Sequence, residues 1–147
     1  MSSLISGSRA YIKSRILLCD SDYQEIKDPV GTDDLQLSNI DKHYKLIIGA
    51  DSPFLDGNFY GDIIACELEI YKKAGYSETE DFDNLYDLAI DIKNEIIDPT
   101  VVKNSTVFSD IEIISLIPEP LNSNDKVFKI ITTLQIRRDF AYQGELT

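Results

Sequence analysis

The segment Val127–Phe140 constrains the fold of this chain more than any other, because its side chains alternate in character over most of its length. One alternate set is expected to point inward and consists of Phe128, Ile130, Thr132, Leu134 and Ile136. The other set is expected to point outward and consists of Val127, Ile131, Thr133, Gln135 and Arg137. A period of two predicts a β-strand with one buried face. Such a strand needs neighbouring strands and a second layer that covers its apolar face.

Three further segments are predicted strands, namely Tyr44–Ala50, Ile63–Lys72 and Asp110–Ile117. In the second, one face is expected to carry Cys66, Leu68 and Ile70, and the other Glu67, Glu69 and Tyr71. In the third, one face is expected to carry Ile111, Ile113, Ser115 and Ile117, and the other Ile114 and Leu116. This third strand is therefore apolar on both faces. Gly49 and the run 51–53 predict the end of the first strand, and residues 56–61 are predicted to form a connecting loop.

Two helices are predicted beside these strands. Residues 1–18 place apolar residues at helical spacing and carry three basic residues with no acid. A central helix over residues 81–97 has an apolar stripe made of Phe82, Leu85, Ala89, Ile92 and Ile96. Residues 77–80 have the form of a capping box, and Pro99 is predicted to stop the helix at or before Asp98. Residues 20–42 are predicted to be a long acidic loop, and residues 141–147 a loose tail.

These elements predict an α+β fold in a single domain that spans residues 1–147. Because two strand pairs flank the central helix, the economical packing is an antiparallel or mixed sheet of four to five strands. The N-terminal helix and the central helix are expected to pack together on one face of that sheet.

The side-chain inventory argues against catalysis. The chain has one histidine, His43, and two cysteines, Cys19 and Cys66, which lie far apart in apolar runs. A nucleophile with its base, or a zinc site, needs more such residues close together. Neither glycine motif that cradles phosphates occurs. We therefore expect no enzymatic activity, no cofactor and no metal ion. The lack of a signal peptide and of a long apolar run predicts a soluble protein made in the cytoplasm.

Charge and apolar pattern together favour a role in protein assembly. A formal net charge of −12 disfavours binding to nucleic-acid phosphates. The basic N-terminal helix and the acidic central helix provide two complementary surfaces. The second face of the sheet is more apolar than a solvated face usually is, through Ile114, Leu116, Val127 and Ile131. The predicted interface residues are Arg9, Lys13, Arg15, Asp83, Asp87, Asp91, Ile114, Leu116, Ile131, Arg137 and Arg138.

Over residues 3–140, this order of elements resembles the tail terminator proteins of long-tailed bacteriophages, the lambda-type tail-tube terminators. The likeness covers the short N-terminal helix, the acidic loop and a strand entered through Asn39–Gly49. It continues through the second strand with Glu67–Tyr71, the central helix 81–97 and a final hairpin that ends in Arg137–Phe140. It is a likeness of order and spacing and contains no catalytic motif.

The resemblance implies a ring, expected to be a hexamer, that caps the tail tube and offers a joining surface to the head. The expected partners are further copies of the chain, the tail-tube protein and a head-side neck protein. DNA is expected to pass through the lumen without specific binding, and no membrane is involved. The implied location is the tail and neck region of the virion, after assembly in the host cytoplasm. Rival interpretations are another head–tail connector, such as a head-completion or stopper protein, an acidic adaptor that mimics DNA, and a small ferredoxin-like enzyme.

Overall fold

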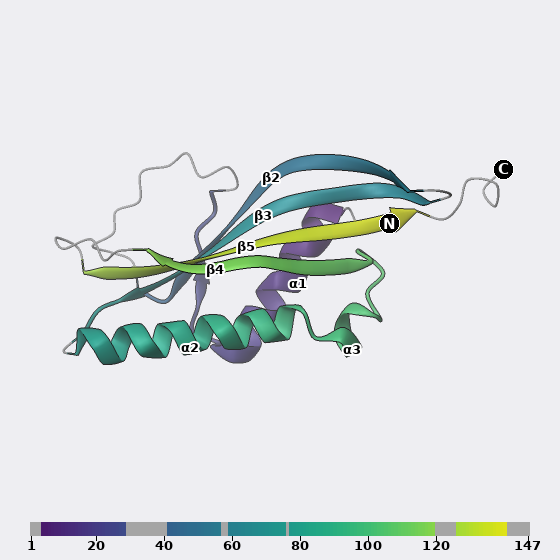
Figure 1. Cartoon of the computed structure of the whole chain (residues 1–147). Helices are drawn as coiled ribbons and strands as arrows, with labels where there is room; N and C mark the ends of the chain where they lie inside the picture. The colour runs from purple at the N-terminus through teal and green to yellow at the C-terminus, as the bar shows by residue number, and fades with distance from the viewer. Residues whose placement is uncertain (1–3, 29–40, 57–58, 76, 120–125, 141–147) are drawn as a thin grey trace.

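A computed structural model describes residues 4–28, 41–56, 59–75, 77–119 and 126–140. In these parts of the chain, the helices are α1 (Leu4–Cys19), α2 (Glu78–Ile96) and α3 (Pro99–Val102). The strands are β1 (Gln24–Glu25), β2 (His43–Asp56), β3 (Phe59–Lys73), β4 (Asp110–Glu119) and β5 (Val127–Phe140). They form one five-stranded sheet in the order β1-β2-β3-β5-β4 (Figure 1). Only the β1–β2 pair is parallel, so the sheet is mixed and the predicted α+β fold is confirmed.

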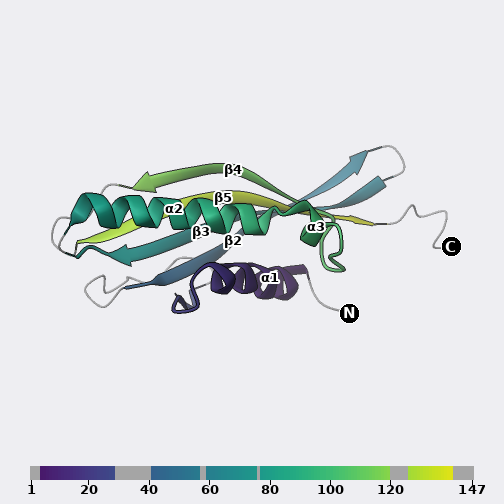
Figure 2. The ribbon, with the colours of Figure 1, turned by 90° about the horizontal axis from the view of Figure 1, so that it is seen from below.

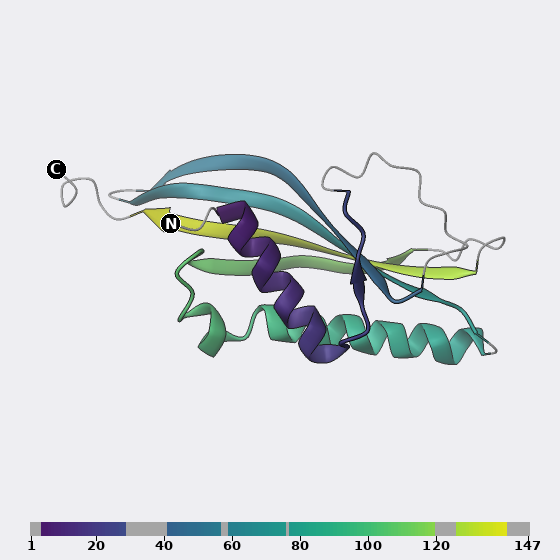
Figure 3. The same cartoon turned by 180° about the vertical axis from the view of Figure 1, so that it is seen from behind.

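Both long helices lie on the same face of the sheet, as predicted (Figure 2). Helix α1 buries Leu4, Ser8, Ile12 and Ile16, which recur every four residues. Helix α2 buries Leu85, Ala89, Ile92 and Ile96. The side chain of Ser77 caps α2 by accepting a hydrogen bond from the Glu80 N–H at 3.4 Å. Figure 3 shows α1 crossing in front of the sheet, with one end beside α2.

The main core lies between this helical layer and the sheet. The side chains predicted to point inward from the last strand are all buried there: Phe128, Ile130, Thr132, Leu134 and Ile136. Cys66, Leu68 and Ile70 of β3 are buried beside them. Because each fully buried isoleucine or leucine contributes roughly 1.5–3 kcal/mol, this layer dominates the stability of the fold.

The predicted end of the first strand is wrong. Strand β2 continues through Asp51 and Pro53 to Asp56, and its register with β3 shifts between Ile48 and Asp51. A β-bulge accommodates the extra residues at that point, and pairing with β3 resumes beyond it. Most of the predicted 56–61 loop is therefore strand as well. Gly61 allows the close approach, because a Cβ atom there would overlap the carbonyl oxygen of Arg138.

The predicted acidic loop 20–42 is not irregular throughout. Residues Gln24 and Glu25 form β1, which pairs in parallel with His43 and Tyr44 at the edge of β2. No strand was predicted there because a strand of two residues has no detectable period. Residues 29–40 of that loop, and the tail 141–147, lie outside the described residues.

Candidate assembly surfaces

The face of the sheet opposite α1 and α2, called here the open face, carries several apolar side chains with Glu67 and Glu69 of β3 between them. Strand pairing places Ile47 of β2, Ala65 of β3 and Ile131 of β5 on this face. A shallow hollow of about 300 Å³ lies over Ile47, Gly49 and Ala65. Ile131 was predicted to point this way and does so. Among the described residues, helices cover only the other face (Figure 1).

Strand β4 adds the most exposed apolar side chains. Ile114 is 51% exposed and Ile117 is 56% exposed. The register with β5 shifts between Ile113 and Ser115, so Ile114 is the extra residue of a bulge. Beyond the bulge, Leu116 pairs with Thr132 and Ile117 pairs with Ile131.

The prediction that Leu116 lies on the open face is therefore wrong. Leu116 packs against the main core, and Ile117 takes its place on the open face. One extra residue exchanges the faces of every side chain after it, because side chains alternate with a period of two. Nothing in the pattern of β4 reveals the bulge, since isoleucines stand on both sides of it.

One end of the open face is covered by residues 26–28. Tyr71 and Val127 point toward this face, but they are only 2% and 4% exposed because Ile26 packs against them. The predicted direction of both side chains is confirmed, and Val127 is not part of an exposed patch. We call residues 20–28 the strap, because Tyr23 lies in the core on the helical side whereas Ile26 contacts the open face.

A buried ion-pair cluster holds the strap in place. The Lys45 ammonium lies 3.4 Å from the Asp28 carboxylate and 3.7 Å from the Glu69 carboxylate. The exposed fractions of these three side chains are 5%, 3% and 8% respectively. The Tyr71 hydroxyl donates a hydrogen bond of 2.7 Å to Glu69. Burial, together with the Glu69 carboxylate, raises the pKa of Tyr71, so this hydroxyl stays protonated and donates.

Lys129 extends the cluster across the sheet. Its ammonium lies 3.2 Å from both Glu69 and Glu119. Burial opposes its charge, but the two carboxylates raise the pKa of Lys129 above its ordinary value. The sequence patterns missed this cluster. A lysine at an outward position of a strand is ordinarily expected to be solvated. The partners of Lys45, which are Asp28 and Glu69, are distant from it in the sequence.

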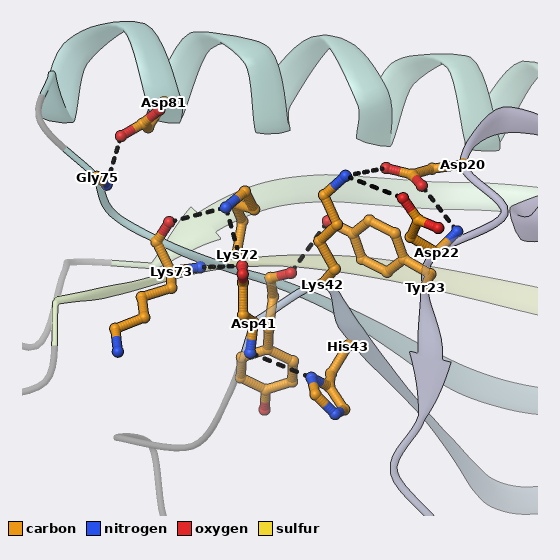
Figure 4. A network of polar contacts seen from close by, with 11 residues as sticks. Asp20, Asp22, Tyr23, Asp41, Lys42, His43, Lys72, Lys73, Gly75 and Asp81 are labelled. Carbon is orange, nitrogen blue, oxygen red and sulfur yellow. Dashed lines mark hydrogen bonds and ion pairs between the residues drawn. The ribbon is translucent and has the colours of Figure 1, made fainter.

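A second polar network lies at the other end of the strap, around Asp20 and Asp22 (Figure 4). The Asp41 carboxylate accepts hydrogen bonds from the Lys72 ammonium at 2.8 Å and the Lys73 N–H at 3.3 Å. Burial acts to raise the pKa of Asp41, but these hydrogen bonds and the lysine charge lower it below its usual value. The Asp41 N–H donates to Nδ1 of His43 at 3.1 Å, so the lone histidine has a structural role here.

The same turn contains Lys42, which has a positive φ of 48°. A non-glycine residue in this left-handed region is strained and needs support from its surroundings. The Lys42 ammonium lies 3.1 Å from Asp20 and 3.8 Å from Asp22 (Figure 4). This network therefore ties the turn before β2 to the turn after α1. A hollow of about 240 Å³ beside it is lined by Tyr23, Lys42 and Leu88, among others.

The three basic residues of α1 differ in their surroundings. The Arg9 guanidinium donates to the Leu46 carbonyl oxygen at 3.1 Å, at the edge of β2. Arg15 lies 3.6 Å from Glu95 of α2. Lys13 is exposed. Two of the three predicted interface cations therefore have partners within this chain, whereas Lys13 is exposed to solvent.

Helix α2 carries the three predicted acids on its exposed side. Asp83, Asp87 and Asp91 are all exposed and stand four residues apart. Successive members rise by about 6 Å along one side of the helix. We call this row the acidic stripe.

The predicted pair Arg137 and Arg138 lies near the end of β5, which continues to Phe140, and the two side chains leave the strand on opposite faces. Arg137 lies 2.6 Å from Asp139 and stacks 4.2 Å from the centre of the Phe54 ring. Arg138 lies 3.6 Å from Asp62. Both arginines therefore have contacts within the chain, near the distal end of the β2–β3 hairpin.

Chemically reactive arrangements are scarce in the described parts of the chain. No group of three or more His, Cys, Asp or Glu residues there is placed to hold a metal ion. Burial raises the pKa of the Cys66 thiol to about 11, which disfavours the thiolate that a nucleophile requires. No helix among the described residues has the length and apolar character needed to cross a membrane.

The surfaces that remain as candidates for function are the open face with Ile114 and Ile117, the acidic stripe and Lys13. Each of them suits contact with another protein better than chemistry on a small molecule. Comparison with protein-family models and with curated proteins found no match to this chain.

Proposed function

We propose that this chain is a structural subunit of a ring that terminates a bacteriophage tail tube and joins it to the head. The observation that carries the proposal is the open face, where the exposed Ile117 pairs with Ile131, together with the exposed Ile114 on the same strand. Apolar side chains grouped on one sheet face are typical of an association surface. The order of elements and the helices on one face agree with what the likeness to tail terminators implies.

A ring needs two different surfaces on each subunit, because a closed head-to-tail assembly uses a heterologous interface. The acidic stripe is one such surface. Lys13 on α1 supplies the opposite charge to a neighbouring copy, whereas Arg9 and Arg15 hold α1 in place within its own subunit. Opposed charges at such an interface mainly fix orientation and speed association.

Charge reversal on the two helices tests this arrangement. Lys13→Glu and Asp87→Lys should each lower ring formation with a tail-tube protein, and the double variant should restore part of it. Lys103→Glu is the matched control, because Lys103 is also exposed but lies outside both helices in the interface. Light scattering gives the mass of the assembly, and negative-stain electron microscopy shows rings. Rings of unchanged yield in both single variants would refute the charge pairing.

The ring itself is tested separately. The unmodified chain, mixed with tail-tube protein, should form rings that stop tube growth at one end. A chain that stays monomeric and leaves tube length unchanged would overturn the proposal. A net charge of −12 per subunit should also keep assembled rings from binding duplex DNA at moderate salt, as measured by fluorescence anisotropy.

Other positions in the neck remain the first alternative. A stopper or head-completion protein would bind head-side proteins without capping tubes. An acidic adaptor that mimics DNA is the second alternative, which the exposed acidic stripe favours. It predicts that the unmodified chain binds a basic DNA-binding enzyme without capping tubes, and that neutralising Asp83, Asp87 and Asp91 abolishes this binding.

A further inference from the structure

The hollow of about 240 Å³ beside Lys42 lies where α2 meets the turn before β2 and the end of β3. Its lining combines apolar and charged side chains from both helical and strand segments. Since one water molecule occupies about 30 Å³, the space corresponds to about eight waters, or to an organic molecule of roughly eight to ten non-hydrogen atoms. That is slightly below the range of pockets for drug-sized ligands, so the hollow suits a smaller molecule.

One part of the lining is apolar. Leu85 and Leu88 contribute to it from α2, and both pack against the main core. The Tyr23 ring also lines the hollow, and its hydroxyl is already occupied, because it donates a hydrogen bond of 3.0 Å to the Tyr71 carbonyl oxygen. An aliphatic group bound here would exchange water for apolar contacts, whereas a polar group would lose its water without a replacement.

Asp81 supplies a carboxylate that lacks a cation. It accepts a hydrogen bond of 2.5 Å from the Gly75 N–H through one oxygen, which fixes the side chain in place (Figure 4). Among the residues that the structure describes, no lysine or arginine forms an ion pair with Asp81. The second oxygen of this half-buried carboxylate can therefore pair with a cationic group of a ligand.

Two lysine ammonium groups line the same hollow, and each has an unused hydrogen-bond donor. The Lys72 ammonium donates to Asp41 at 2.8 Å and to the Lys73 carbonyl oxygen at 3.2 Å. The Lys42 ammonium lies within ion-pair distance of two aspartates of the strap. Because an ammonium carries three N–H groups, at least one on each lysine is left to donate to an anionic oxygen.

The donors are held in place before any ligand binds. Lys42 has a φ of 48°, and its carbonyl oxygen accepts a hydrogen bond of 3.0 Å from the Gln24 N–H, so β1 fixes this strained turn. Strained backbone of this kind clusters at ligand sites. The Asn84 side chain also lines the hollow and has no hydrogen-bond partner among the described residues. Its amide adds one more donor and one more acceptor to the site.

We propose that this hollow binds a free amino acid with an apolar side chain of about the size of leucine. The ammonium group of the ligand pairs with Asp81, its carboxylate accepts hydrogen bonds from Lys42 and Lys72, and its side chain lies on the apolar part of the lining. A zwitterion fits because the lining offers both charges: an anion would be repelled by the aspartates, and a cation by the lysines. None of the proposed ring contacts lines the hollow, so the inference goes beyond the proposed function.

Three probes of similar size test the proposal on the full chain by isothermal titration calorimetry. They are L-leucine, 3-methylbutylamine, which lacks the carboxylate, and 4-methylpentanoate, which lacks the ammonium group. Leucine should bind at least about tenfold more tightly than either analogue, because each analogue leaves one side of the charged lining without its partner. Nuclear magnetic resonance should show leucine-dependent shifts of the Lys42 and Leu85 amides. Absence of saturable leucine binding, or equal affinity for all three probes, would overturn the proposal.

Substitutions on α2 locate the contact without disturbing the core. Asp81→Asn keeps an oxygen for the Gly75 N–H but removes the charge, so it should weaken leucine binding about tenfold without weakening binding of 4-methylpentanoate. Asp83→Asn is the matched control, since Asp83 is exposed on the same helix and does not line the hollow. Asn84→Ala, at an exposed position, should weaken leucine binding independently. Leucine affinity that stays unchanged in both Asp81→Asn and Asn84→Ala would refute the site.

Discussion

Replacing Lys45 by methionine should destabilise the protein strongly, although the methionine fills a similar volume. The change leaves the carboxylates of Asp28 and Glu69 buried without the cation that lies 3.4 Å and 3.7 Å from them. Removing one partner of a buried ion pair costs about 3–5 kcal/mol. Glu69 keeps Lys129 at 3.2 Å and the Tyr71 hydroxyl at 2.7 Å, so the lower end of that range is expected.

The expected loss is therefore about 3 kcal/mol in the free energy of unfolding. For a chain of this length that corresponds to a fall in Tm of roughly 6–12 °C. Urea unfolding monitored by circular dichroism measures the free energy. Hydrogen exchange adds a local measure, because the Ile26 N–H that bonds to the Tyr44 carbonyl at 2.7 Å should lose protection when the strap loosens.

Two controls separate the buried cluster from lysine replacement in general. Lys27→Met changes an exposed lysine next to Asp28 and should stay within about 0.5 kcal/mol of the unmodified protein. The double variant Asp28→Leu with Lys45→Met should recover much of the loss, because apolar side chains can replace a buried pair at little cost. A Lys45→Met variant that loses less than about 1 kcal/mol would refute the view that the cluster anchors the strap.

Three further results are expected. Leu134→Ala should cost about 2–5 kcal/mol in urea unfolding, because Leu134 is 0% exposed in the core. Gly61→Ala should lower Tm markedly in thermal unfolding, since its Cβ would overlap the Arg138 carbonyl oxygen and rigid backbone cannot yield cheaply. The pKa of Asp41 is lowered from 3.8 in the folded protein, chiefly by its hydrogen bond with Lys72. Ionised Asp41 therefore stabilises the fold above pH 3.8, and this stabilisation is lost as the pH falls through the lowered pKa of the folded state. Asp41→Asn should therefore be less stable than the unmodified protein at pH 7 and approach it near pH 3 in urea titrations; a constant difference would contradict this.

The helical layer and its side of the sheet could be predicted because local periodicity reports on them directly. The inward set of β5 and the stripe of α2 are apolar at the period of the element that carries them. A largely antiparallel sheet was expected from two strand pairs around a central helix, whereas the pairing of β3 with β5 was not predicted. These features depend on residues that are close in sequence, so a single chain contains enough information to identify them.

The open face could be predicted only in part, because its details depend on register and on distant partners. A bulge between Ile113 and Ser115 exchanged the faces of Leu116 and Ile117, and bulges leave no periodic signal. The pairing of Asp28 with Lys45 joins residues on opposite sides of an acidic segment. Charge alone offered many acids as partners for Lys45, and only the fold shows that Asp28 and Glu69 are the two within reach.

The strap has a consequence for how this chain can change during evolution. Asp28 is fixed by Lys45 and Asp41 is fixed by Lys72, so the sheet holds both residues that flank positions 29–40. Insertions between two fixed ends are inexpensive, because doubling the length of a connection costs only about 0.6 kcal/mol in closure entropy. Both anchors are therefore held to the sheet by ion pairs that involve none of the residues between them.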